Sequence, residues 1–212
     1  MLTRGARLSG RIVTDGAALP QSAVVEVTAS PVDLGVIVPP DMAGQVRANA
    51  DGTFKLNDLV GPRLLRARVV GPRAWIAQAI THNGRNLIDS PINLKSGEEL
   101  AGVEIVLTSR VARLNGTVTD AANRLLTDYS VLLFPEDRTL LGNPRRLTRL
   151  IRPTTAGDFS IDNILPGAYL IAALDDVDDA QWLNADYLER FRPRATRIDL
   201  GASEQKTIVL QR

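Results

Sequence analysis

The two halves of this 212-residue chain repeat one pattern of apolar and turn residues. Asp51–Leu56 resembles Ala156–Ile161, and the apolar residues that follow keep the same spacing in both halves. Upstream, Leu8–Ile12 matches Leu114–Val118 with a slip of one residue, sharing the form apolar-x-Gly-x-apolar. Because these matches occur in the same order along both halves, a duplicated domain explains them better than chance. The sequence therefore predicts one domain over 1–108 and a second over 109–212.

Both halves show the alternation that is typical of β-strands. Apolar and polar residues alternate in Phe54–Leu56, and Val103, Ile105 and Leu107 alternate with Glu104 and Val106. Ser130–Phe134 is a run of strand length. Turn signals separate such runs at short intervals, which predicts an all-β sandwich rather than alternating β and α units. A length of 212 residues suits two sandwiches of roughly 100 residues each.

Three segments carry more specific local signals. Asn83-Gly84 predicts a hairpin turn because both residues tolerate a positive φ. Pro166-Gly167 predicts a type II turn, with Pro fixing the first φ and Gly accepting the second. Acidic residues precede an apolar pattern that Pro193 would stop, so we expect a short helix near 184–191 in the second domain.

These motifs together resemble the carboxypeptidase regulatory-like domain. The second half carries them best, as Leu114-x-Gly116-x-Val118, then Gly157-x-Phe159, then Leu165-Pro166-Gly167-x-Tyr169, whereas Gly61-Pro62 reverses the turn order in the first half. The resemblance implies two tandem seven-stranded Greek-key sandwiches of the transthyretin-like, Ig-like kind. It also implies a non-catalytic part of a large bacterial secreted, periplasmic or cell-envelope protein.

That resemblance assigns structural roles to the motif residues. Gly52 and Gly157 would permit the hairpin backbone, Phe54 and Phe159 would point inward from the next strand, and Tyr169 would cover one end of its sandwich. None of these roles involves chemistry at a bound substrate.

Composition narrows the possible functions further. The chain has no cysteine, which excludes thiol catalysis and cysteine-ligated metals, and its formal net charge of +1 predicts no general attraction to nucleic acid. No apolar run is long enough for a membrane-spanning helix. The first residues lack the apolar core of a signal peptide, so the protein is either cytosolic or a fragment whose targeting signal lies upstream. A strand pattern begins almost directly after Met1, at Leu8, so we favour a fragment and expect further domains upstream.

The sequence offers little for an active site. His82 is the only histidine and lies beside the Asn83-Gly84 turn, where a solvated role is expected instead of that of a catalytic base. Neither a phosphate-binding loop nor a dinucleotide glycine motif is present. We therefore predict a protein that is not an enzyme and that needs no cofactor.

Two kinds of charged cluster could bind ions. The acidic cluster consists of Asp175, Asp176, Asp178 and Asp179, whose oxygens would suit calcium, although the spacing and central glycine of an EF-hand are missing. The arginine clusters consist of Arg145, Arg146, Arg149 and Arg152, and of Arg190, Arg192, Arg194 and Arg197. An anion surface is one interpretation of these arginines, and solvated loops paired with nearby acids are the other.

Aromatic residues suggest an alternative function. Trp75 and Trp182 follow the repeated core strand in the two halves, and with Tyr169 they could stack on a sugar ring if exposed. Buried core positions are the other interpretation, and aromatics make up only 4% of the chain. We expect a structural spacer or protein-interaction module with an unknown protein or glycan partner, and we keep a carbohydrate-binding module as the alternative.

Overall fold

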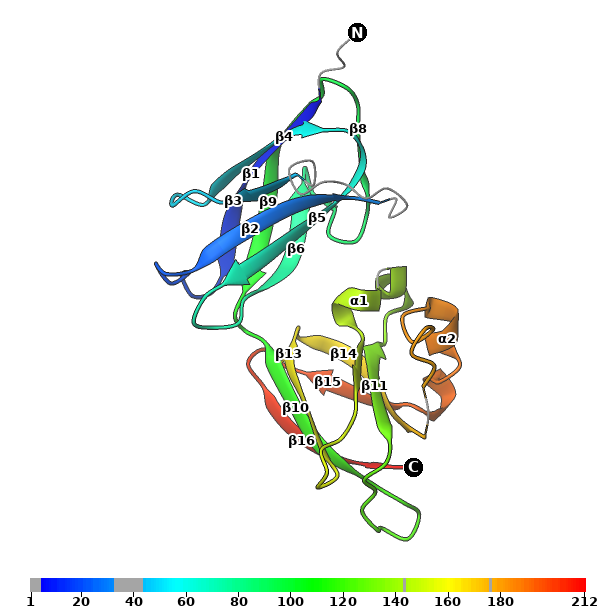
Figure 1. Ribbon diagram of the computed structural model, residues 1–212. Helices are drawn as coiled ribbons and strands as arrows, with labels where there is room; N and C mark the ends of the chain where they lie inside the picture. Colours follow the sequence, from blue (N-terminus) through cyan, green and yellow to red (C-terminus); the bar gives the residue numbers. More distant parts are fainter. Residues whose placement is uncertain (1–4, 33–43, 143, 176) are drawn as a thin grey trace. The chain divides into compact units, whose positions relative to one another are not determined.

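The computed structural model describes residues 5–32, 44–142, 144–175 and 177–212. The chain divides into two compact units, Met1–Ser109 and Arg110–Arg212, within one residue of the boundary suggested by the repeat. Both units are β-sandwiches with separate sheets on either side of an apolar core (Figure 1). The all-β sandwich fold is thus confirmed.

Within its described residues, the first unit contains one mixed sheet, in which β1 and β9 are parallel, and one antiparallel sheet. One sheet has the order β4-β1-β9-β6-β7 and the other the order β3-β2-β5-β8. The strands are β1 (Ala6–Asp15), β2 (Val24–Pro31), β3 (Gln45–Arg47), β4 (Thr53–Leu59), β5 (Gly61–Val70), β6 (Ile76–His82), β7 (Arg85–Asn86), β8 (Ile92–Leu94) and β9 (Glu99–Thr108).

The second unit has a three-stranded sheet, β13-β10-β16, and a four-stranded sheet, β12-β11-β14-β15, over the part that is described. Its strands are β10 (Ala112–Thr119), β11 (Ser130–Pro135), β12 (Arg149–Ile151), β13 (Asp158–Ile164), β14 (Gly167–Leu174), β15 (Thr196–Leu200) and β16 (Gln205–Gln211). Its helical segments are η2 (Arg138–Gly142), α1 (Pro144–Leu147), α2 (Ala185–Glu189) and η3 (Arg192–Arg194).

The same cross-strand contact recurs at the centre of each unit. Gly10 on β1 lies opposite Phe54 on β4, and Gly116 on β10 lies opposite Phe159 on β13. Both phenylalanines are buried, as the motif predicts. A Cβ on Gly116 would lie 2.5 Å from the carbonyl oxygen of Ile208 and 2.6 Å from the Phe159 ring. Glycine is required here because the neighbouring strand and the ring occupy the space of a side chain.

The turn before each of these phenylalanines also matches expectation. Gly52 and Gly157 have φ of 82° and 84°, the left-handed region that favours glycine. Asn83 and Gly84 both have positive φ, and β6 pairs with β7 around them, so the predicted hairpin is confirmed. At each of these turns, the left-handed conformation lets the chain reverse tightly without displacing the strands on either side.

The turn at Pro166-Gly167 differs from the prediction. Gly167 has a φ of 158°, far from the +80° of a type II turn, so the predicted turn type is wrong. The residue with left-handed backbone is Asn163, at φ 57°, three positions before Pro166. Asn tolerates this conformation, and its place in the chain moves the bend into the end of β13.

The two units diverge after their equivalent strands β5 and β14. In the first unit the chain forms β6 and β7, and β6 pairs with β9. In the second unit the corresponding stretch forms α2 and η3 instead. Seven strands are therefore described in the second unit, as predicted, whereas nine are described in the first. The two additional strands are those of the Asn83-Gly84 hairpin: β6 pairs with β9, and β7 pairs with β6.

The predicted helix near 184–191 is present as α2. Asn184 caps its first turn, with its side-chain oxygen accepting from the backbone N–H groups of Asp186 and Tyr187 at 2.9 and 3.2 Å. Leu188 is fully buried and Phe191 nearly so, within the core cluster that also contains Phe134. Burial of these two side chains explains why so short a helix is stable.

The first and last strands of each unit run parallel and side by side. β1 pairs with β9, and β10 pairs with β16. In the second ladder, the Arg113 N–H donates to the Glu204 carbonyl at 2.8 Å, and the Arg212 N–H donates to that of Thr119 at 3.0 Å. The backbone N–H and C=O groups of successive residues in a strand point to opposite edges. Those of the even-numbered residues of β16 therefore bond to β10, and those of the odd-numbered residues point away from it.

Replacing Gly116 tests the importance of the close contact. We expect Gly116→Ala to lower the free energy of unfolding by about 2 kcal/mol or more, because the added methyl group overlaps backbone and ring. Urea unfolding followed by circular dichroism measures this loss. Gly201→Ala is the control, since its nearest neighbour is the flexible carboxylate of Glu204, and its effect should stay within about 0.5 kcal/mol. Equal effects of both substitutions would contradict this explanation.

Candidate functional site

Tyr169 is a structural residue of the second sandwich. It lies on β14 opposite Ile198 of β15, and its side chain is only 3% exposed. Its hydroxyl donates a hydrogen bond of 2.8 Å to the carbonyl oxygen of Leu165, four residues earlier. Such a bond back across a corner fixes the path of the chain between two strands, as in the tyrosine corner of Ig-like domains.

The two tryptophans do not form an exposed pair of rings. Trp75 is 7% exposed and belongs to the core of the first unit, while Trp182 is half-buried against the core of the second. Tyr169 is also buried. The carbohydrate-binding alternative requires exposed aromatic rings, and of the three proposed rings only that of Trp182 is partly exposed. The indole N–H of Trp75 has no hydrogen-bond partner among the described residues, which costs stability rather than providing function.

The acidic cluster is not gathered around a common point. Asp175 pairs with Arg212 at 2.5 Å and Asp179 with Arg152 at 3.4 Å. The carboxylate of Asp178 accepts from the Ala180 N–H and the Gln181 side chain, at 2.9 and 2.7 Å. Asp176 lies outside the described residues. Over 5–32, 44–142, 144–175 and 177–212, no group of three His, Asp or Glu side chains could hold a metal ion.

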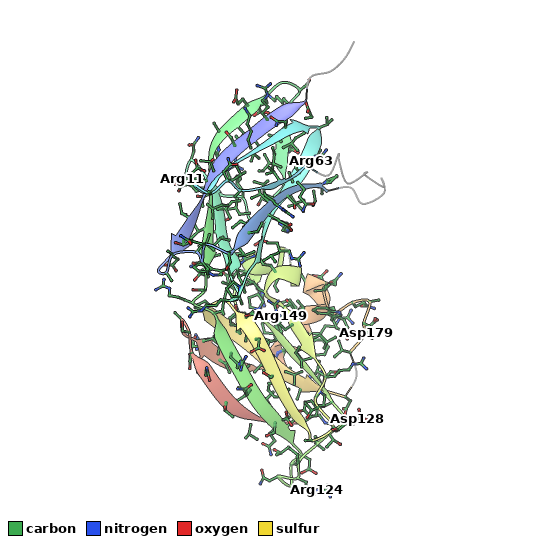
Figure 2. All side chains as sticks on the ribbon, turned by 60° about the vertical axis from the view of Figure 1, so that its left-hand side comes forward. Arg11, Arg63, Arg124, Asp128, Arg149 and Asp179 are labelled. Atoms are coloured by element: carbon green, nitrogen blue, oxygen red, sulfur yellow. The ribbon has the colours of Figure 1, made fainter. Side chains whose placement is uncertain are left out.

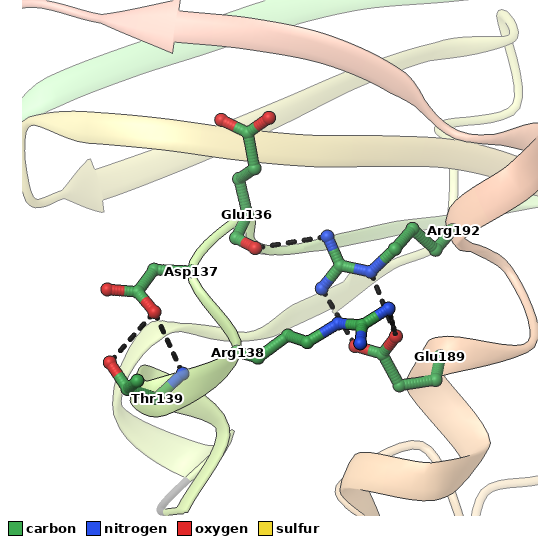
Figure 3. A network of polar contacts seen from close by, with 6 residues as sticks. All are labelled: Glu136, Asp137, Arg138, Thr139, Glu189 and Arg192. Carbon is green, nitrogen blue, oxygen red and sulfur yellow. Dashed lines mark hydrogen bonds and ion pairs between the residues drawn. The ribbon is translucent and has the colours of Figure 1, made fainter.

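The second arginine cluster forms an ion-pair network with acids of the same unit (Figure 3). Arg192 donates to both carboxylate oxygens of Glu189, at 2.9 and 2.7 Å, and to the backbone carbonyl of Glu136 at 3.0 Å. Arg138 reaches Glu189 at 3.0 Å, and Arg197 reaches Glu136 at 2.9 Å. This network ties the α2–η3 segment to the η2 segment, and it uses the guanidinium groups that an anion site would need.

The ion pairs of this network shift the pKa values of its members. The hydrogen bond from Arg192 lowers the pKa of Glu189 below its usual value, against a smaller effect of burial. The same bond raises the pKa of Arg192. The remaining arginines of the cluster lie over aromatic rings, Arg190 over Tyr187 and Arg194 over Phe191, each 5.7 Å from the ring centroid.

The first arginine cluster is dispersed. Arg149, labelled in Figure 2, lies on β12 and is half-buried, and burial lowers its pKa. It donates to the carbonyl oxygens of Arg146 and Thr148, at 3.0 and 2.9 Å. Arg152 pairs with Asp179, and the side chain of Arg145 lies outside the described residues. Pairing with nearby acids thus describes Arg152, Arg192 and Arg197.

His82 lies at the end of β6, opposite Arg85 in the hairpin that the sequence predicts. Its ring is half-buried. No hydrogen bond to a serine hydroxyl or a carboxylate orients it among the contacts described, so the geometry of a catalytic triad is not assembled there.

A groove at one end of the first sandwich was not predicted from the sequence. It encloses about 660 Å³ between β1, the start of β2, β3 and the turn before β4. Its lining is mostly apolar with three longer polar side chains: Ile12, Leu19, Pro20, Gln21, Ala23, Val24, Val25, Arg47, Ala48, Asn49, Ala50 and Gly52. These residues come from three separate segments, so only the fold brings them together. The one feature of the sequence that hints at this groove is the apolar pair Leu19-Pro20, whose neighbours Ala18 and Gln21 are exposed in the structure.

A buried arginine was also missed. Arg63 on β5 is 6% exposed, and its guanidinium donates to the carbonyl oxygens of Val60 and Ala29, at 2.9 and 3.2 Å. Burial lowers its pKa. These bonds hold β2 and the β4–β5 turn together, which gives the side chain a structural role.

Comparisons with known proteins give distant similarity only. No protein-family model matches the chain, and no curated protein does. Among solved structures, the TIE protein of Bacillus anthracis is 10% identical over 97% of this chain and 33% of its own, with a TM-score of 0.32. A streptococcal ancillary pilin is 11% identical over all of this chain and 63% of its own, with a TM-score of 0.36.

A third structure, described as a putative carbohydrate binding protein from Pseudomonas aeruginosa, is 17% identical over 48% of this chain and 88% of its own, with a TM-score of 0.30. At these values, function has to be inferred from the geometry of the chain itself. In the described part of the chain, helices of the length and apolarity needed to cross a bilayer are absent.

The hydroxyl of Tyr169 should contribute measurably to stability. We expect Tyr169→Phe to lower the free energy of unfolding by about 1–3 kcal/mol, since the substitution leaves the buried carbonyl of Leu165 without a donor. Tyr187→Phe is a matched control, because the Tyr187 hydroxyl only accepts a 3.1 Å bond from the Asp178 N–H in an exposed turn. A change in Tyr169→Phe as small as that in the control would rule out the proposed corner.

Alkaline pH should destabilise the fold through the same residue. Burial raises the pKa of the Tyr169 phenol, only partly offset by the charges of Arg149 and Arg146. The stabilisation is fully present below the ordinary pKa near 10 and is lost as the pH rises through the higher folded-state pKa, because the unfolded phenol ionises first. Unfolding titrations from about pH 8 to about pH 11 should show a smaller loss in Tyr169→Phe than in the wild type.

Proposed function

We propose that this chain is a non-catalytic tandem β-sandwich module that acts as a spacer within a larger protein. One observation carries the proposal: the first and last strands of each unit are parallel neighbours, β1 with β9 and β10 with β16. Because parallel strands point the same way, the chain enters each sandwich at one pole and leaves at the opposite pole. A unit of this kind extends the distance between whatever precedes and follows it.

The same geometry suits a module under tension. Force applied to the two ends of a unit pulls the parallel strands past one another, so that the hydrogen bonds between them are loaded together. In the second unit this ladder runs from Arg113 opposite Gln205 to Thr119 opposite Gln211 without a register shift. β9 ends at Thr108 and β10 begins at Ala112, so only a short connection separates the two ladders along the chain.

The contacts of the candidate site residues support a non-catalytic role. The Tyr169 hydroxyl and the Arg192 guanidinium make hydrogen bonds within their own unit, and Trp75 fills the core of the other. The groups that could have bound a substrate or ion are thus used to hold the fold together. The groove near Val24 and Arg47 leaves room for protein interaction as an additional role of the module.

The finer assignment also belongs to this proposal. The matched registers of Gly10 with Phe54 and of Gly116 with Phe159 support two copies of one domain, of the carboxypeptidase regulatory-like kind that their motifs resemble. On that resemblance we place the module in a secreted or envelope protein of a bacterium, where such domains occur in tandem.

Single-molecule pulling tests the spacer role. Stretching the chain from its two ends should give two separate unfolding events, each releasing roughly 300 Å of chain, because each unit of about 100 residues has its own core and shear-loaded ladder. The control uses the absence of cysteine in this chain to attach handles at Arg113→Cys and Glu204→Cys, which lie together at one end of the β10–β16 ladder. Pulling there breaks the bonds one at a time, so the second unit should open at a clearly lower force. Equal forces in the two geometries would refute the spacer proposal.

A further inference from the structure

The outer edge of β16 is open in the second unit. In the first unit the equivalent strand, β9, lies between β1 and β6, with Ile80 opposite Ile105 and Thr81 opposite Glu104. In the second unit β16 has β10 on one side, and no described strand lies on the other. The chain that could have supplied a counterpart of β6 forms α2, whose Leu188 is buried in another part of the sandwich.

This edge presents a regular row of backbone groups. The even-numbered residues of β16 bond to β10, so the N–H and C=O groups of the odd-numbered residues point outward: Gln205, Thr207, Val209 and Gln211. Unpaired groups along an extended strand are a template for another strand. Val209 adds apolar surface to the row, with 66% of its residue surface exposed.

β4 and β13, the other terminal strands of seven residues in their sheets, are protected in ways that β16 is not. Each pairs with its neighbour through a register shift, and each carries two charged residues. Between Thr207 and Gln211 β16 has no charge, and Lys206 turns its amine to the carbonyl of Asp199 at 2.7 Å. Charges and irregularities normally prevent edge pairing, so their absence marks this edge as receptive.

We propose that this edge binds the same edge of a second copy of the chain, in an antiparallel pair centred on Ile208. In this register Thr207 faces Val209 of the other copy and Gln205 faces Gln211, so every outward-pointing backbone group meets another. Ile208 faces its counterpart on the inner side, and Lys206 faces Leu210, which keeps the two ammonium groups apart. Because the interface is two-fold symmetric, one pairing uses both edges and assembly stops at a dimer.

Dimerisation through this edge is a proposal separate from the spacer role. Either proposal can fail without the other, because the pulling experiment is made on single molecules. Sedimentation equilibrium over a wide range of concentration should show the full chain passing from monomer to dimer. Val209→Lys places two like charges diagonally across the pair, and Val209→Pro removes an outward N–H without affecting the bonds to β10. Both should weaken the dimer at least about tenfold.

Val60→Lys is the matched control, because Val60 is exposed to a similar extent, 68%, and lies in the β4–β5 turn of the other unit. It should leave the association unchanged. A wild type that stays monomeric, or a dimer that Val209→Lys does not weaken, would disprove the proposal.

Cross-linking tests the register itself. The chain has no cysteine, so Ile208→Cys introduces a single thiol at the two-fold centre, where opposed Cα atoms lie within disulfide range. We expect a disulfide-linked dimer under mild oxidation. Gln205→Cys should give none, because its counterpart lies at the far end of the pair. Equal cross-linking at both positions would overturn the register. A monomeric chain that binds a synthetic peptide with the sequence of Ile76–His82 would instead show that the edge accepts a different strand.

Discussion

The parallel pairing of the first and last strands, made possible by one glycine, is the contact on which each sandwich depends. Gly116 lies between β13 and β16, and the Phe159 ring and the Ile208 carbonyl fill the space of its missing side chain. The first unit builds the same contact from Gly10 and Phe54. Without it, β1 and β10 could not approach both neighbours closely, and neither the sheet nor the inward-facing core residues would be aligned.

The sandwich fold also explains why side chains that could bind a ligand make contacts within the protein. A sandwich of about 100 residues has a small core, so long side chains are needed to close its ends and corners. Tyr169 closes a corner, Arg63 ties a turn to β2, and Arg192 anchors the α2–η3 segment. Each makes bonds that would otherwise be available to a ligand, and the proposal of a non-catalytic module rests on these contacts.

The two units differ most after β5 and β14. In the first unit the chain forms β6 beside β9 and then turns at Asn83-Gly84, where two successive positive φ values lead into β7. A capped helix with buried apolar residues takes the place of this hairpin in the second unit. The last strand therefore has a covered edge in the first unit and an open edge in the second, so the two units need not have the same role.

The sequence by itself determined the features that depend on local geometry. Alternating apolar residues defined the strands around Phe54 and Phe159, and glycine defined the turns at Gly52 and Gly157. The acidic residues, the apolar pattern that follows them and Pro193 defined α2. Such features follow from the spacing and conformational freedom of neighbouring residues, which are written in the chain.

Only the tertiary structure decided what depends on residues distant in the sequence. The bend near Asn163, the burial of Trp75, the pairing of Arg192 with Glu189, and the groove beside Val24 all required knowledge of which strands adjoin. The open edge of β16 is the clearest case. Its sequence is that of an ordinary strand, and whether a strand is covered depends on where the rest of the chain goes.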